Sequence, residues 1–485
     1  MSVRAEPGLA AVVPLETRAQ SSVPPWSRLD WTAIGAITVA GAVLRLYHLG
    51  TRSLWFDEGF SAGIALMRWP DFLRVNAGYS ANMALYYLLL KFWMPLGNSD
   101  AWTRGLSVLF GIAAISALYW LARRLFGSSA ATAAALLLAV NAFHVKYSQE
   151  ARSYSLAAFL VILSCILLLR ALERATSRAW LAWSLVSALA VMAHTYAVLP
   201  IGAQIVWTFF VVPAKERSRF FAAVRWFVLA LVPYGVIMTR GGSGAIGWLR
   251  PFTVRQLGET VVQVCGNAGW TLPLLFAAAC VGAFWLRREE RPAFALPALW
   301  AIVPFIAVIA MAQIKPLLYP RYMIVCLPGI LLMAAAAVRP LPRWLAAAWL
   351  LAAVGVSLWA TSTYYRQDFL PHDDWRAAAA YVRAHRNPGD RLVFYTWQGT
   401  LAYHYYWWQA DRSAPRPDPN YLRYANIAEL LQDQPEDARH VWVLLDHFGG
   451  SDPNEIWVRG WFSRKYTIAS EKEFRGIAVV EYQHK

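Results

Sequence analysis

The chain has 485 residues, of which 58% are hydrophobic and only 15% are charged, and its mean hydropathy is +0.37. These values exclude an ordinary soluble protein and are typical of a protein that crosses a membrane many times. The formal net charge is +16, but the basic residues lie between apolar runs, which indicates membrane orientation and not nucleic-acid binding.

The first 29 residues are polar and lack the apolar core of a secretory signal peptide, so we predict a cytoplasmic N-terminal tail at 1–29. Apolar segments close to the length of a transmembrane helix recur between residues 30 and 363, and we count about eleven of them. The expected fold class is therefore a polytopic α-helical membrane protein with a transmembrane domain at 30–363.

A long polar and aromatic segment at 51–103 follows the first apolar segment, and we predict that it forms a large outer loop. Within it, residues 83–96 are apolar but too few to cross a bilayer, and Lys91 and Pro95 interrupt them. This pattern favours a short interfacial or re-entrant helix over a full span.

Arg and Lys clusters occur in alternate loops along the chain. If the N-terminus is cytoplasmic, all of these clusters lie inside, as the positive-inside rule requires. The remaining loops then lie outside, and they are the loops with unusual polar residues. The sequence therefore predicts a plasma (inner) membrane protein with residues 364–485 outside the cytoplasm.

The segment 364–485 changes character, because an alanine-rich helical run is followed by a turn and by short apolar stretches at 392–395, 441–445 and 477–482. Stretches of this length and composition are typical of β-strands. We expect a small extracytoplasmic α/β domain.

Asp57 and Glu58 are two adjacent carboxylates in the sequence LWFDEGFS, at the predicted outer edge of the membrane. A carboxylate in such a position is usually solvated, paired or used in chemistry. Asp57 could accept the proton of an acceptor hydroxyl. A helix cap or a salt bridge to Arg52 is the structural alternative.

A second polar group lies at 144–154, between two apolar segments. Its cations could hold a phosphate, and its imidazole and carboxylate could hold a divalent cation. Simple anchoring in the headgroup zone explains the same residues. The candidates here are His144, Lys146, Tyr147, Gln149, Glu150 and Arg152.

Two further outer positions carry candidates. His194 lies near the outer end of an apolar segment and is either a ligand or a helix–helix hydrogen-bonding group. The loop at 315–322 holds Lys315, Arg321 and Tyr322 between two prolines, which suits either capture of a lipid phosphate or anchoring to anionic lipid. Together, an acid and phosphate-binding cations on one side of a membrane indicate glycosyl transfer from a polyprenyl-phosphate sugar.

The same residues resemble the C-superfamily (GT-C) of membrane glycosyltransferases, in particular the dolichyl-phosphate-mannose protein mannosyltransferase-like group, glycosyltransferase family 39 and its bacterial relatives. The resemblance covers roughly residues 30–200. It depends on the order of the blocks at 54–58 (LWFDE), 85–90 (LYYLLL), 123–127 (RRLFG), 147–154 (YSQEARSY) and 315–322 (KPLLYPRY).

The resemblance implies an inverting transfer from a polyprenyl-phosphate monosaccharide to a glycan, lipid or protein acceptor. By position, Asp57 is the expected catalytic base and Glu58 an orienting or capping partner. Arg152 and Arg321 are the expected contacts to the donor phosphate, with Lys146, Lys315 and Tyr322 as further candidates, and Tyr86, Tyr147 and Gln149 are other site candidates. A divalent metal ion is expected at Glu150, with His144 and His194.

The sequence departs from the family at one place, since many relatives have His-Pro-Pro where this chain has Asn82-Met83-Ala84. A function of that histidine is therefore absent, moved or carried out by Asn82. The alternatives to an enzyme are a lipid-linked sugar transporter and a non-catalytic protein of polysaccharide assembly. A transporter should have polar residues along a path through the spans, whereas the middles of these spans are nearly free of charge.

Overall fold

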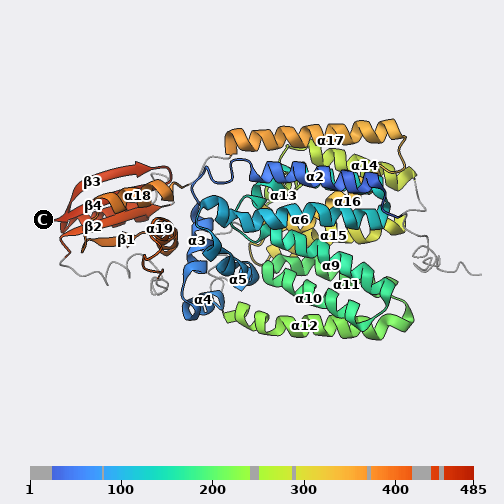
Figure 1. Ribbon diagram of the computed structural model, residues 1–485, viewed down its shortest axis with the longest axis horizontal. Coiled ribbons are helices and arrows are strands. Elements are labelled where there is room, and N and C mark those ends of the chain that lie inside the picture. Colours follow the sequence, from blue (N-terminus) through green and yellow to red (C-terminus); the bar gives the residue numbers. More distant parts are fainter. Residues whose placement is uncertain are drawn as a thin grey trace, which may run out of the picture.

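The computed structural model describes residues 25–78, 81–240, 251–286, 291–368, 373–417, 438–446 and 453–485. Long helices lie side by side in one bundle, and a smaller unit that contains a four-stranded sheet lies beyond one end of it (Figure 1). This arrangement confirms the predicted fold class of a helical membrane protein with a small C-terminal α/β unit.

Seven helices of the described residues are long and apolar enough to cross a membrane, or eight if the bent pair α7 (Ser128–Val140) and α8 (Ala142–Ser148) is one span. Three shorter apolar helices accompany them, so the predicted number of about eleven spans is not confirmed. The long helices are α2 (Arg28–Leu46), α6 (Asp100–Phe126), α9 (Tyr154–Arg174), α12 (Arg217–Arg240), α15 (Arg291–Ala312), the segment η7–α16 (Pro320–Cys326 and Leu327–Ala337) and α17 (Arg343–Thr363).

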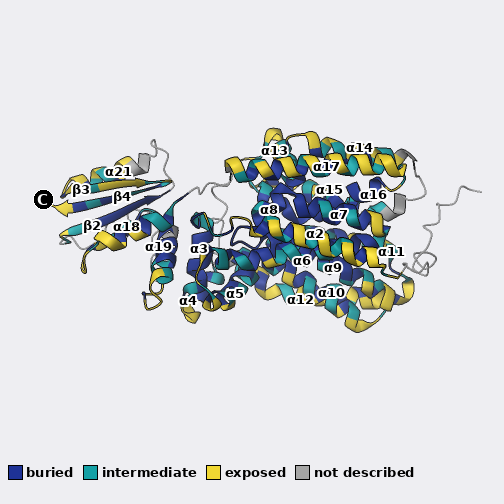
Figure 2. Cartoon of the chain, turned by 45° about the horizontal axis from the view of Figure 1, so that its top comes forward, coloured by how far each residue is buried: buried dark blue, intermediate teal, exposed yellow. Residues whose placement is uncertain are grey.

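The outer surface of the bundle is apolar and exposed, and the helix faces that meet one another are buried (Figure 2). Phe210, Trp344 and Leu351, for example, are each more than 70% exposed. An apolar outer surface of this kind is suited to contact with lipid. The shorter helices of the bundle are α10 (Ser177–Ala193), α11 (Val198–Val211), α13 (Val254–Cys265) and α14 (Thr271–Leu286).

The predicted first loop is largely helical, and it lies between the bundle and the C-terminal unit (Figure 1). It contains α3 (Phe56–Leu66), α4 (Trp69–Asn76) and α5 (Ala84–Trp93). Helix α5 has ten residues, which is too short to span a membrane and confirms the short helix expected at 83–96. The loop ends earlier than 103, because the Ser99 hydroxyl accepts a hydrogen bond from the Trp102 N–H (3.0 Å) and caps α6.

The C-terminal unit contains a sheet in the order β1-β2-β4-β3, in which β1 is parallel to β2 and the other two pairs are antiparallel. Three strands agree with the expected stretches, and β3 was not expected. In the described part of this unit, three helices accompany the sheet. The elements are α18 (Trp375–His385), β1 (Arg391–Phe394), α19 (Trp397–Ala410), β2 (His440–Asp446), α21 (Pro453–Ser463), β3 (Tyr466–Phe474) and β4 (Ile477–His484).

Candidate active site

The carboxylate pair lies in the first turn of α3, directly after the N-cap residue Trp55. Glu58 accepts a hydrogen bond from the Trp55 N–H (3.3 Å), which closes half of a capping box. Acidic residues are favourable here because the helix N-terminus carries partial positive charge. The two side chains nevertheless enter different surroundings, since the Glu58 side chain is fully buried and the Asp57 side chain is 18% exposed.

Glu58 forms a buried ion pair with Arg104 of α6. The guanidinium donates from Nε and Nη2 to the two carboxylate oxygens, each at 2.7 Å, and the Ala151 N–H donates to Oε1 at 2.9 Å. Arg104 also donates to the carbonyls of Leu49, Arg52 and Ser53. Both oxygens are thus bonded within the protein, which gives Glu58 a structural role, and its catalytic role stays a prediction.

Asp57 lies between two arginines from distant parts of the chain. Arg321 Nη1 is 2.9 Å from Asp57 Oδ2, and Arg152 Nη2 is 3.8 Å from the same oxygen. Both arginines are mostly buried. One carboxylate and two guanidinium groups thus meet at the end of the bundle that carries α3.

Arg152 is held by further contacts from the first loop. Its Nη1 donates to the Asp57 carbonyl, the Ser61 hydroxyl and the Tyr87 hydroxyl, each at 3.2 Å. Burial lowers the pKa of Arg152, but the neighbouring Tyr87 hydroxyl and Asp57 carboxylate outweigh it and raise the pKa above its ordinary value. Arg152 is therefore a fixed cation.

Arg321 lies in η7, which Pro320 begins. Its guanidinium carbon lies 4.9 Å from the ring centre of Tyr319 and between 5.7 and 5.9 Å from those of Trp55, Tyr154 and Tyr322. Contacts of this kind between a guanidinium and aromatic faces are attractive. Aromatic rings therefore hold Arg321 beside Asp57.

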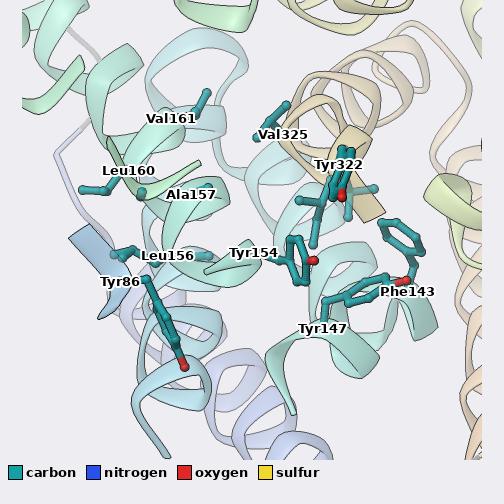
Figure 3. Packing of buried hydrophobic residues seen from close by; sticks show 14 of the residues in the cluster. Tyr86, Phe143, Tyr147, Tyr154, Leu156, Ala157, Leu160, Val161, Tyr322 and Val325 are labelled. Carbon is teal, nitrogen blue, oxygen red and sulfur yellow. The ribbon is translucent and has the colours of Figure 1, made fainter. Parts of the chain in front are cut away.

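An aromatic cluster lies beside these charges. Ring centres are 5.1 Å apart for Tyr147 and Tyr154, 5.7 Å for Tyr154 and His194, and 5.2 Å for His194 and Tyr322. Figure 3 shows Tyr147, Tyr154 and Tyr322 gathered together, with Tyr86 apart from them. Within the part of the chain that the structure describes, the Tyr154 hydroxyl and His194 Nε2 are buried without a hydrogen-bond partner.

Glu150 lies between Tyr147 and Tyr154 of this cluster, in the irregular segment that joins α8 to α9. Its carboxyl is buried, and Oε2 has no hydrogen-bond partner among the described residues. Burial raises the pKa of Glu150, while the positive charges of Lys146 and Arg52 act in the opposite direction.

This geometry can be compared with known proteins. Residues 83–238 match the model of the dolichyl-phosphate-mannose-protein mannosyltransferase family. No curated protein sequence matches the chain. The structure of ArnT from Cupriavidus metallidurans bound to undecaprenyl phosphate is similar over 94% of this chain and 98% of that chain, with a TM-score of 0.60 and 15% identity.

The chain therefore shares its fold with ArnT. Apo ArnT from the same organism matches with a TM-score of 0.61 and 14% identity over 92% of this chain and 97% of that one. The Archaeoglobus fulgidus oligosaccharyltransferase AglB, solved with an inhibitory peptide and a dolichol-phosphate, matches with a TM-score of 0.53 and 12% identity. This match covers 86% of this chain and 69% of that one.

Two predicted site residues instead join structural elements. The Tyr86 hydroxyl lies 2.8 Å from Ser107 Oγ, and Gln149 Nε2 donates to the carbonyls of Arg45 and Tyr47 at 3.0 and 2.9 Å. Gln149 Oε1 accepts from Tyr364 at 3.2 Å. These bonds give both side chains a structural role, and their contact with substrate stays a prediction.

The predicted metal site is not assembled as expected. His144 Nδ1 is 2.7 Å from Arg45 Nη2, and His194 Nδ1 accepts from the Tyr196 N–H at 3.3 Å. Arginine and a backbone N–H can only donate, so in both imidazoles Nδ1 is the acceptor and Nε2 carries the proton, which removes the lone pair that a metal would need. Among the described residues, no group of three His, Cys, Asp or Glu side chains could hold a metal ion.

Two predicted residues lie apart from Asp57, Arg152 and Arg321, and two residues that contact this group were not predicted. Lys315 is exposed after α15, Asn82 is half-buried in the short helix η1 (Ala81–Met83), and both stay predictions. The sequence indicated neither Tyr87 nor Tyr154 as a separate candidate. Each is one of several tyrosines in an aromatic-rich block, and spacing alone does not distinguish the tyrosine that meets Arg152.

Proposed function

We propose that the protein transfers a monosaccharide from a polyprenyl-phosphate donor to an acceptor hydroxyl, with inversion at the anomeric carbon. The observation that carries this proposal is the meeting of the Asp57 carboxylate with the guanidinium groups of Arg321 and Arg152. A base beside two cations matches what this displacement requires, because a proton is removed on one side and negative charge develops on the other.

In the proposed step, the acceptor oxygen forms a bond to the anomeric carbon as the bond from that carbon to the phosphate oxygen breaks. The acceptor proton moves to Asp57, and the bonding electrons leave with the polyprenyl phosphate. The phosphodiester of the donor becomes a phosphomonoester, which gains one negative charge. Arg321 and Arg152 are placed to stabilise that added charge.

The ion pairs of Asp57 also suggest how the donor prepares the site. The two guanidinium groups lie against the carboxylate. A donor phosphate attracts the same groups, since guanidinium binds phosphate in the same forked geometry as carboxylate. Donor binding therefore frees Asp57 to act as a base when the sugar is in place.

The unpaired atoms of the aromatic cluster are suited to the sugar of the donor. The Tyr154 hydroxyl and His194 Nε2 are buried and lack partners among the described residues, and a buried polar group without a partner is costly. Sugar hydroxyls would supply the missing hydrogen bonds. We assign these two residues to the sugar and the two arginines to the phosphate.

The likeness to a structure of ArnT solved with undecaprenyl phosphate supports a lipid phosphate as part of the donor. The distribution of Arg and Lys supports a plasma-membrane location with α3 and the C-terminal unit outside the cytoplasm. We derive no step through a metal ion, because the predicted histidine ligands do not fit one, and a cation at Glu150 stays a prediction.

The test is transfer by full-length protein in proteoliposomes, supplied with a panel of radiolabelled polyprenyl-phosphate hexoses and pentoses and an envelope lipid extract as acceptor. Asp57→Asn should lower the rate roughly 10²- to 10⁴-fold, because the base is lost while the shape is kept. Asp71→Asn, which changes another acidic residue of the first loop in α4, is the control and should keep the wild-type rate.

Near-normal transfer by Asp57→Asn would contradict the assignment of the base. Binding of the labelled donors by the wild type without any release of polyprenyl phosphate would favour the non-catalytic alternative.

A further inference from the structure

Helix α19 of the C-terminal unit packs directly against α3, the helix that carries Asp57 (Figure 1). Two glycines one helical turn apart make this approach possible. A Cβ added at Gly59 would lie 2.5 Å from Ala402 Cβ and 2.9 Å from Ala402 Cα, and one at Gly63 would lie 2.5 Å from Leu401 Cβ. Because backbone atoms are involved, no side-chain movement could relieve these contacts, so the two helices are tightly matched.

The backbone that leads into α3 finds its hydrogen-bond partners in the same unit. The Leu54 N–H donates to the Tyr406 hydroxyl at 2.6 Å, and the Phe56 N–H donates to Asp373 Oδ2 at 3.1 Å. Phe56 is the first residue of α3 and neighbours Asp57. The carboxylate of Asp373 thus caps, from a distant part of the chain, a helix whose own N-cap residue Trp55 makes no side-chain cap bond.

Arg376 of α18 fixes the preceding residues. Its backbone N–H donates to Ser53 Oγ at 3.1 Å, and its Nη2 donates to the carbonyls of Gly50 and Arg52, both at 3.1 Å. Nη2 also lies 2.5 Å from Asp100 Oδ2 at the start of α6. The guanidinium therefore links the C-terminal unit to both ends of the first loop.

Asp100 is the common acceptor of this junction. Besides Arg376, it accepts from the hydroxyls of Tyr405 and Tyr406 at 3.0 and 2.7 Å and from Gln409 Nε2 at 2.9 Å. Its side chain is almost fully buried. A buried carboxylate that accepts from four donors is held rigidly in place. Three of the four donors to Asp100 belong to α19.

From these contacts we propose that the C-terminal unit is part of the active site, with Asp373, Arg376 and Tyr406 acting as positioning residues that hold the segment leading to Asp57. The inference rests on the proposed function, because it assigns these residues to the placement of the proposed base. None of the three touches the charged group at Asp57 in the contacts described above. They act through the backbone of residues 50–56.

The physical reason is the precision that a base requires. Displacing a catalytic group by about 1 Å can cost on the order of 10²-fold in rate. The segment 50–56 is irregular, and much of its hydrogen bonding is to the C-terminal unit and to Arg104. Loss of one outside bond would leave a backbone group without its partner and widen the range of positions that Asp57 occupies.

The first test compares Asp373→Ala, Asp373→Asn and wild type in the transfer assay. Asp373→Ala should lower kcat about 10-fold or more, with the KM for the donor changed less than about threefold, because the phosphate contacts are intact. Asp373→Asn keeps an oxygen that accepts from the Phe56 N–H, so it should recover most of the rate. Asp411→Ala, which removes two exposed hydrogen bonds from Ser413 within the C-terminal unit, is the control and should match wild type.

The second test widens the interface between the helices. Gly59→Ala should push α19 away from α3 and lower kcat in the same way. Gly355→Ala on α17 is the matched control, since a Cβ there meets nothing within 4 Å.

Hydrogen–deuterium exchange on the full chain in nanodiscs gives a readout that does not depend on turnover. Peptides covering residues 50–58 should exchange faster in Asp373→Ala and Gly59→Ala than in wild type, Asp411→Ala and Gly355→Ala. Unchanged exchange, or a wild-type kcat in Asp373→Ala, would overturn the positioning role. If the wild type does not transfer sugar but the two variants still exchange faster, the proposed function is overturned. The contact between the C-terminal unit and α3 is then still supported.

Discussion

Two adjacent acids of one helix have opposite environments. Asp57 is partly exposed beside two arginines, whereas Glu58 is fully buried and bonded to Arg104 at both oxygens. Consecutive residues of a helix point about 100° apart, so one turn can direct one carboxylate toward substrate and the next into the protein. Asp57 is therefore the member of the pair that we propose as the base, and Glu58 supports the loop.

Removing the charge of Glu58 should destabilise the protein. Glu58→Gln leaves the Arg104 guanidinium buried without its counter-charge, and breaking one partner of such a pair costs about 3–5 kcal/mol of unfolding free energy. Heat-induced unfolding of the purified protein should begin at a distinctly lower temperature. Glu259→Gln breaks the exposed Arg255–Glu259 pair and should change stability by less than about 1 kcal/mol. Equal effects of the two variants would contradict a special role for the buried pair.

The sequence alone predicts on which side of the membrane the charged residues lie, but not which of them form ion pairs with one another. The positions of Asp57, Arg152 and Arg321 could be predicted as one group, because all three fall on one predicted side of the membrane. The ion pair of Glu58 with Arg104 depends on how α3 is rotated about its axis relative to α6. The spacing of residues in the sequence does not predict that rotation. For the same reason Tyr86 was favoured over its neighbour Tyr87, which is the one that meets Arg152.

At the scale of elements, the break between α7 and α8 determines where the segment with Glu150 and Arg152 lies. The two helices meet at 59°. Asn141 caps α8, since its Oδ1 accepts from the His144 N–H at 2.9 Å, and its Nδ2 donates to the Cys265 carbonyl at 3.1 Å. Arg45 donates to the freed carbonyls of Leu138 and Ala139. The bend therefore has its polar groups satisfied inside the protein.

Loss of the Asn141 side chain should weaken this bend. Asn141→Ala removes the cap and leaves the Cys265 carbonyl without this donor, and we expect a loss of about 1–3 kcal/mol of unfolding free energy. Asn141→Asp keeps the capping oxygen and should fall between Ala and wild type. Heat-induced unfolding of the three proteins in the same detergent measures the order. An Asp variant less stable than the Ala variant would contradict the capping role.

Helices and strands with a regular apolar pattern can be predicted from the sequence. An element whose conformation depends on pairing with a neighbouring strand cannot. The strands β1, β2 and β4 are apolar runs and could be found in the sequence. Strand β3 reads YTIASEKEF, lies at the edge of the sheet and is mostly exposed, so it lacks the alternation that marks a half-buried strand. Its partner β4 determines its conformation.

At the scale of the whole molecule, stability should depend on pH through one buried acid of the C-terminal unit. Burial, together with the nearby Asp373 carboxylate, raises the pKa of Asp446 from 3.8 to about 7, although hydrogen bonds from Thr396 act in the opposite direction. A carboxyl whose folded pKa is above its unfolded value stabilises the fold fully below the unfolded pKa and loses that contribution as pH rises through the folded pKa.

The C-terminal unit should therefore lose stability between about pH 4 and pH 7, by roughly 4 kcal/mol over the whole range if Asp446 acts alone. Asp446→Asn, which cannot ionise, should remove this dependence and unfold at the same temperature at pH 5 and pH 8. Limited proteolysis of the full chain at the two pH values, followed at the C-terminal unit, is the measurement. A wild type that resists proteolysis better at pH 8 would contradict the sign.

The junction between α3 and α19 also determines the order in which the protein can be completed during synthesis. Leu54 and Phe56 donate to residues 352 and 317 positions later in the chain. At about 5–20 residues per second, a ribosome needs roughly 15–70 s to add the residues between them. Throughout that interval the nascent loop is already made but lacks these partners. The segment that leads to Asp57 is thus translated early and fixed in place late, only after the C-terminal unit has been made.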